Sequence, residues 1–243
     1  MKRLRFLAFG LLSLLLLGSC SKDEEATGIG DAIIISKQSE AKTVYGLALY
    51  AYTFSSFKTV DATCSTAPAT IYTLKSNQGY TTNFSYETPE TEYTSTRPKS
   101  ATVNFSAVFE NGVTQAFQDE LTENILAPLT IGSCTFNTTD NQLEVSWTPN
   151  SSASSYSVSL LDGSTVVFRG SELENSINSF KIGKTTSEWI TQRATDGTES
   201  KYTPTVGKTY TLRVSAFLYE SSANNAYNLQ SISFADKSFK WGE

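Results

Sequence analysis

The chain has 243 residues, a net charge of −5 and no histidine. Without histidine, Ser-His-Asp and Cys-His catalysis, His-based zinc sites and the commonest general base near neutral pH are excluded. The acidic balance, with no basic stripe, argues against nucleic acid as a partner. Charged residues are only 18% of the chain, and Ser, Thr, Asn and Tyr are abundant, as is typical of extracellular β proteins.

The first twenty residues, MKRLRFLAFGLLSLLLLGSC, contain a basic start, an apolar run from Phe6 to Leu17 and a small-residue ending before Cys20. The apolar run is too short for an ordinary membrane span and has the length of a signal-peptide core. The ending LGSC resembles the bacterial lipobox. This resemblance implies a lipoprotein signal peptide at residues 1–19, with lipid attached to Cys20. The alternative is an ordinary signal peptide with a chance cysteine.

A strongly charged segment, SKDEE, follows Cys20. Its simplest interpretation is a solvated tether. The run CSKDEE also resembles the export signal of Bacteroidetes surface lipoproteins, which implies an anchor in the outer membrane that faces the cell exterior. An anchor that faces the periplasm is the alternative. We expect residues 20–30 to form a flexible lipidated tether, and the mature chain, with 16 basic and 24 acidic residues, to carry a net charge of about −8.

Residues 31–127 contain short segments with strand character, separated by turns. The alternation of Val103, Phe105, Ala107 and Phe109, followed by the turn Glu110-Asn111-Gly112, predicts a hairpin into residues 113–117. Further strands are expected at residues 32–36, at 44–57 as one or two strands, at 71–74 and at 80–87. We interpret this half as an immunoglobulin-like β-sandwich of about seven strands, ending at a short, stiff linker near Ala127-Pro128.

The second half shows clearer alternation. Strands are predicted at residues 143–147, at 156–160, at 166–168 after the tight turn Asp162-Gly163, and at 210–218. A final strand over residues 232–241 is expected to break at Asp236-Lys237.

Three segments of this half, LEVSWTP, ASSYSVSLLDG and GKTYTLRVSAF, resemble strands of a fibronectin type III domain. The resemblance implies that Trp147 lies in the core and that Tyr210 is the corner tyrosine, whose hydroxyl bonds back to nearby backbone. It covers residues 129–242 and departs at residues 171–203, which are longer and more irregular. We therefore expect an all-β chain of two tandem antiparallel β-sandwiches, with the second domain at residues 128–243. Such folds do not specify a function.

Chemically reactive residues are scattered in the sequence. Cys64 and Cys134 fall in different expected domains, which favours unpaired thiols, with Cys134 as a small buried residue. The acidic residues are interpreted as solvated; they are Asp119, Glu120, Glu123, Glu172, Glu174, Asp196 and Glu199. We predict no catalytic residue, no metal site and no cofactor.

Trp189 is the one candidate ligand contact, because it lies in the irregular segment. It would form an exposed platform on which a sugar or peptide stacks. The alternative is a plug that covers one edge of the sandwich. Tyr45, Tyr50 and Tyr52 similarly divide between core and surface.

These features favour a non-enzymatic cell-surface lipoprotein for adhesion or for capture of an extracellular glycan or protein, held on the membrane by its lipid. One alternative is a carboxylate-based glycoside hydrolase or an accessory subunit of a polysaccharide-utilisation system. Another is a structural spacer.

Overall fold

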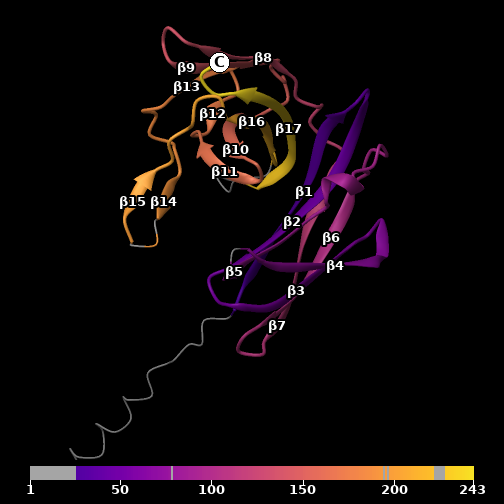
Figure 1. Cartoon of the computed structure of the whole chain (residues 1–243). Coiled ribbons are helices and arrows are strands. Elements are labelled where there is room, and N and C mark those ends of the chain that lie inside the picture. The colour runs from indigo at the N-terminus through magenta and orange to yellow at the C-terminus, as the bar shows by residue number, and fades with distance from the viewer. Residues whose placement is uncertain (1–25, 78, 194, 196, 222–227) are drawn as a thin grey trace, which may run out of the picture.

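The computed structural model describes residues 26–77, 79–193, 195, 197–221 and 228–243 (Figure 1). The regular secondary structure of these residues consists of strands, apart from one short 3-10 helix, η1 (Glu90–Glu92). The expected all-β class is therefore confirmed. Cys20 and the expected signal peptide lie outside the described residues. Within the described part, no helix is long and apolar enough to cross a membrane.

The first module is a seven-stranded sandwich. Its strands are β1 (Gly28–Ser39), β2 (Lys42–Thr53), β3 (Phe57–Cys64), β4 (Ala67–Asn77), β5 (Tyr80–Glu87), β6 (Ala101–Phe109) and β7 (Thr114–Leu121). Strands β1-β2-β5-β4 form one sheet and β3-β6-β7 the other, with β4 also paired to β3. This is the order of immunoglobulin constant-type domains, so the interpretation of this half is confirmed.

The core of this module follows the alternation visible in the sequence. Val103, Phe105, Ala107 and Phe109 on β6 are all buried. Gly112 supplies the positive φ of 83° that the following turn requires.

Strand β1 begins earlier than expected. Residues 28–30 already belong to it, and Ala26 is buried. A Cβ atom at Gly30 would lie 2.5 Å from the ring of Phe105, so glycine here allows β1 to lie directly on the aromatic core. Residues 26–30 therefore belong to the folded module, and the expected tether over residues 20–30 was too long by these five residues.

The second module has two facing sheets and further short strands. Its strands are β8 (Ile131–Asn137), β9 (Gln142–Trp147), β10 (Ser155–Asp162), β11 (Thr165–Arg169), β12 (Leu173–Glu174), β13 (Ser179–Gly183), β14 (Thr191–Arg193), β15 (Glu199–Lys201), β16 (Thr209–Tyr219) and β17 (Leu229–Lys240). The order β13-β9-β8 faces β11-β10-β16-β17, the fibronectin type III arrangement, as expected. The Tyr210 hydroxyl accepts a hydrogen bond from the Thr205 N–H at 3.0 Å, which confirms the corner tyrosine.

The last strand of this module differs from expectation. Strand β17 does not break at Asp236-Lys237. Asp236 lies opposite Arg213 and accepts two hydrogen bonds from its guanidinium, at 2.7 and 2.8 Å, so the polar residue is accommodated within the strand.

The irregular residues 171–203 include the β14–β15 hairpin, which projects from the module in Figure 1.

The two modules share a sheet, which the sequence analysis did not anticipate. Strand β17 pairs in parallel with β1, with Ile34 opposite Ser231 and Ser36 opposite Ser233. The result is one hydrogen-bonded path from β11 to β7 through both modules.

Buried serines attach the connecting segment to this shared sheet. Ser231 and Ser233 accept hydrogen bonds from the N–H groups of Leu126 and Leu129, at 3.2 and 2.8 Å. Ser36 donates to the Leu126 carbonyl at 2.7 Å. The segment that links the modules is therefore hydrogen-bonded along its length to both β1 and β17.

Candidate functional site

One face of the shared sheet points away from both module cores, and we call it the outer face. On β16 the even-numbered Leu212, Val214 and Ala216 belong to the second core, so the odd-numbered residues point outward. On β1 the residues Ala32 and Ile34 belong to the first core, which again leaves the odd-numbered residues outside. The outer face thus runs continuously across β10, β16, β17, β1 and β2.

A small apolar cluster marks the centre of the outer face. It consists of Ile33, Ile35, Ala48 and Phe234, contributed by both modules. The Arg213 guanidinium lies 4.0 Å from the centre of the Phe234 ring, a cation–π contact.

An ion network beside this cluster also joins the modules. Glu90 on η1 pairs with Lys37 on β1 and with Arg213 on β16, the latter at 3.3 Å. Burial opposes ionisation of Glu90, but hydrogen bonds from Lys37 and Arg213 and their charges together lower its pKa. Glu90 is therefore held as an anion between the two modules.

A groove of about 520 Å³ lies on the outer face of the second module. Its lining includes Ser157 and Ser159 on β10, Arg169 on β11, Glu172, and Phe217 and Tyr219 on β16. The volume falls within the range of small-molecule sites. The groove therefore combines two serine hydroxyls, a cation, an anion and two aromatic rings, one of which carries the Tyr219 hydroxyl.

The groove residues are held in place by contacts within the module. The Tyr219 hydroxyl donates to Glu172 Oε1 at 2.5 Å, which fixes the ring and the carboxylate together. Ser157 and Ser159 stand opposite Ser215 and Arg213 in the β10–β16 ladder. Among the described residues, none forms an ion pair with Arg169. The Arg169 side chain is exposed.

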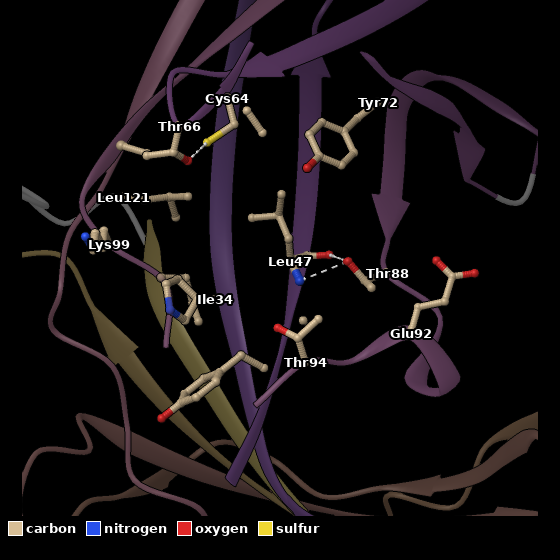
Figure 2. A pocket seen from close by; sticks show the side chains of 15 residues that line it. Ile34, Leu47, Cys64, Thr66, Tyr72, Thr88, Glu92, Thr94, Lys99 and Leu121 are labelled. Atoms are coloured by element: carbon tan, nitrogen blue, oxygen red, sulfur yellow. Dashed lines mark hydrogen bonds between the residues drawn. The ribbon is translucent and has the colours of Figure 1, made fainter. Parts of the chain in front are cut away.

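A second, smaller pocket of about 230 Å³ lies in the first module (Figure 2). Cys64 and Thr66 approach one another at 3.1 Å on one wall, and Thr88 exchanges hydrogen bonds with the backbone of Leu47, both at 3.1 Å, on another. Of the described residues that line it, Glu92 is the single carboxylate. Carboxylate-based glycoside hydrolysis uses two, so this pocket does not present that arrangement.

Three carboxylates from distant parts of the chain meet where β1 leaves β7. One oxygen from each of Asp31, Asp119 and Glu220 lies within 4.8 Å of the others. Burial and then the charge of Asp119 raise the pKa of Asp31, a hydrogen bond with the Leu229 backbone opposes them, and the charge of Glu220 adds to the rise, which brings the pKa to about 7. The interpretation of Asp119 as a solvated residue is wrong, because it is half-buried and accepts a hydrogen bond from the Ala32 N–H at 2.7 Å.

Trp189 does not form an exposed platform. Its side chain is 1% exposed, and its indole N–H donates to the Gly183 carbonyl at 2.9 Å. The ring packs edge-on against Phe168 and Trp241, with centroids 5.1 and 5.6 Å away. The alternative interpretation, a plug within the sandwich, describes its position. Trp147 and Trp241 are also buried, so no tryptophan offers a stacking surface.

The two cysteines of the described chain are not paired with each other. Cys64 is buried and Cys134 is half-buried. Burial raises the pKa of the Cys134 thiol to about 11, which keeps it protonated and unreactive at neutral pH.

The sequence analysis missed the aromatic residues of the outer face. Phe217 and Tyr219 lie at odd positions of the alternating strand that contains Tyr210, so the phase of that strand already placed them outside its core. Tyr50 and Tyr52, which the sequence left between core and surface, stack at 6.1 Å on β2 with an interplanar angle of 11°. Tyr52 is exposed and Tyr50 half-buried.

The fold and the groove define a tandem β-sandwich of immunoglobulin-like and fibronectin type III-like modules. No protein-family model matches the chain, and no curated protein matches it. Among solved structures, it is similar to a β-1,2-glucanase from Parabacteroides distasonis (11% identity, TM-score 0.31), with 88% of this chain and 36% of that chain covered. This chain thus spans about a third of the glucanase.

The chain is also similar to the fibronectin(III)-like modules of Clostridium thermocellum CbhA. The identity is 11% and the TM-score 0.25, with 87% of this chain and 91% of that chain covered. Both TM-scores are too low to carry information about activity.

Proposed function

We propose that the protein is a non-enzymatic binding protein, anchored by lipid on Cys20 to the outer face of the outer membrane, and that it captures an extracellular glycan through the outer-face groove. The groove carries this proposal. Its hydroxyls, Arg169 and Glu172 offer hydrogen bonds to sugar hydroxyls, and the rings of Phe217 and Tyr219 offer apolar faces.

The position of the groove suits presentation to the exterior. Six residue steps separate Cys20 from Ala26, so the lipid lies within about 20 Å of the first module. Strand β17 meets β1 only at Ile34, roughly 20 Å further along the strand. Figure 1 shows the second module beside the later part of β1, where β17 pairs with it, and not beside the start of β1 at Gly28.

Exposed apolar residues gather at the anchor-proximal end. Ile29 and Tyr52 face each other across β1 and β2, and Phe54 lies directly after the end of β2. Phe54 is fully exposed, and Ile29 is 58% exposed. These side chains favour a second candidate function, adhesion through a protein partner, because an exposed apolar patch is typical of interaction surfaces.

An array of glycans and host proteins, probed with the mature chain from Ser21, tests the proposal. We expect selective glycan binding that Arg169→Ala and Phe217→Ala each weaken about tenfold, the value of one lost charged or aromatic contact. Arg193→Ala, an exposed arginine on the β14–β15 hairpin, is the matched control and leaves binding unchanged. Protein binding lost on Phe54→Ser, with no glycan bound, would favour adhesion instead.

Incubation with a polysaccharide panel tests the enzyme alternative. Glu172 is the single carboxylate among the described residues that line the groove, and we expect no turnover. Turnover abolished by one Asp or Glu substitution would establish a glycoside hydrolase. A chain that binds nothing on either panel would be a spacer.

A further inference from the structure

Strand β1 changes its neighbour partway along its length. In its first half β7 lies beside it, where Gln115 accepts a hydrogen bond from the Gly28 N–H at 2.8 Å and Asp119 accepts from Ala32 at 2.7 Å. From Ile34 onward, β17 pairs with it instead. The two strands that flank β1 therefore diverge near Asp31, and we call this place the fork.

Three acidic side chains from three elements converge at the fork. Asp31 comes from β1, Asp119 from β7, and Glu220 directly follows β16. The Glu220 N–H donates to the Asn228 carbonyl at 3.0 Å, which holds the end of β16 against the start of β17. The carboxylate positions are thus set by the backbone of both modules.

Two of the carboxylate oxygens are buried and have no partner within the described chain. Asp31 is only 8% exposed, yet its Oδ1 accepts no hydrogen bond, and the same holds for Oε1 of Glu220. A buried unpaired carboxylate oxygen is costly, and native structures seldom leave one without a counter-ion or donor. Asp31 and Glu220, which carry these oxygens, are two of the three residues whose carboxylates converge within 4.8 Å.

No basic side chain balances this charge within the described part of the molecule. None of its ion pairs includes Asp31, Asp119 or Glu220. The adjacent residues 222–227 read SANNAY and contain no lysine or arginine. Three acidic groups thus meet in a half-buried place, and none of them has an ion-pair partner among the described residues.

We propose that Asp31, Asp119 and Glu220 bind a divalent metal ion, for which Ca²⁺ is the best fit. All three ligands are carboxylate oxygens, which hard cations prefer, and histidine and thiolate ligands for softer metals are absent from this cluster. Water would complete the six to eight oxygens that Ca²⁺ takes.

The ion would act as a clamp between the modules. It would join β1 and β7 of the first module to Glu220, directly after β16 of the second, at the place where β17 replaces β7 as the neighbour of β1. Because the ligands come together only in the folded chain, binding would stabilise the native state.

Direct titration of the mature chain with CaCl₂, followed by calorimetry, tests the site. Tb³⁺ luminescence gives a second readout, since Tyr50 stands opposite Asp31 on β2 and its ring would transfer excitation to a bound lanthanide. We expect one Ca²⁺ ion to bind per chain in a saturable way. We also expect Tb³⁺ to bind at the same site and Ca²⁺ to displace it. Heats and luminescence that do not saturate would overturn the proposal.

Two variants and a control locate the binding. Asp31→Asn and Glu220→Gln are each expected to weaken Ca²⁺ binding about tenfold or more, since the affinity of such sites follows ligand charge. Glu110→Gln removes an exposed carboxylate in the β6–β7 turn and should change nothing. Equal affinity in all four proteins would place the ion elsewhere and refute the assignment.

Thermal unfolding tests whether a bound ion at the three carboxylates stabilises the folded chain. For the unmodified chain, we expect Tm to rise by roughly 5 °C at a hundred-fold excess of Ca²⁺ over its Kd. In EDTA, Asp31→Asn should be at least as stable as the unmodified chain, because one repelling charge is gone, and Ca²⁺ should no longer raise its Tm. A Ca²⁺-dependent rise that persists in both Asp31→Asn and Glu220→Gln would contradict the clamp.

Discussion

Replacing Ser231 with alanine removes one hydroxyl that connects three backbone segments. The Ser231 Oγ donates to the Ile34 carbonyl of β1 at 3.0 Å and accepts from the Leu126 N–H of the linker at 3.2 Å. The serine itself lies on β17 and is fully buried. The substitution therefore tests whether the linker is held by the shared sheet.

The expected cost follows from the group left unpaired. Leu126 is 1% exposed, so water does not replace the lost acceptor for its N–H. An orphaned buried donor costs about 1–3 kcal/mol, and the small void adds little, so we expect a loss of about 2 kcal/mol. For a chain of this size that corresponds to a fall in Tm of roughly 5 °C.

Urea unfolding of the mature chain, followed by tryptophan fluorescence, measures the effect. Ser238→Ala is the matched control, because Ser238 is exposed on the same strand and its loss should change the free energy of unfolding by less than about 0.5 kcal/mol. If both variants lose the same small amount, the buried serine does not hold the linker and the reasoning fails.

Two further predictions concern other contacts. Tyr210→Phe removes the acceptor of the Thr205 N–H and should lower the free energy of unfolding by about 1–2 kcal/mol in the same urea assay. An unchanged urea midpoint would show that the Tyr210 hydroxyl does not stabilise the fold. Glu90→Gln removes the anion between Lys37 and Arg213. Since the pKa of Glu90 is lowered in the folded chain, its contribution is present above pH 4.5 and is lost as pH falls through the folded value. The stability difference between Glu90→Gln and the unmodified chain should therefore shrink on acidification, and a constant difference from pH 7 to pH 3 would count against the ion network.

Local patterns in the sequence predicted most of the strands and turns of each module. Alternation placed Trp147 and Tyr210 in or beside the core, and Asn-Gly and Asp-Gly marked tight turns, because side-chain period and positive φ are properties of a few adjacent residues. The break expected in β17 was wrong because Asp236 has a partner, Arg213, on the neighbouring strand. That partner is 23 residues away, beyond the reach of a local pattern.

The candidate sites were much less predictable. Trp189 was given a surface role because its surrounding segment is irregular, whereas its ring fills the space between Phe168 and Trp241. Asp31 and Asp119 looked like ordinary polar residues, since nothing near either one in the sequence indicates that they meet. Burial and convergence are properties of packed elements and leave no local pattern.

The sequence by itself determined the all-β class, the phase of the strands in both sandwiches and the resemblance to a lipoprotein at the amino terminus. Only the tertiary structure decided that β17 pairs with β1, that the groove lies on a face common to both modules, and that Asp31, Asp119 and Glu220 meet at the fork. The physical reason is that sheet edges pair through backbone hydrogen bonds, which almost any sequence can form. Which edges meet depends on how the two packed modules fit together.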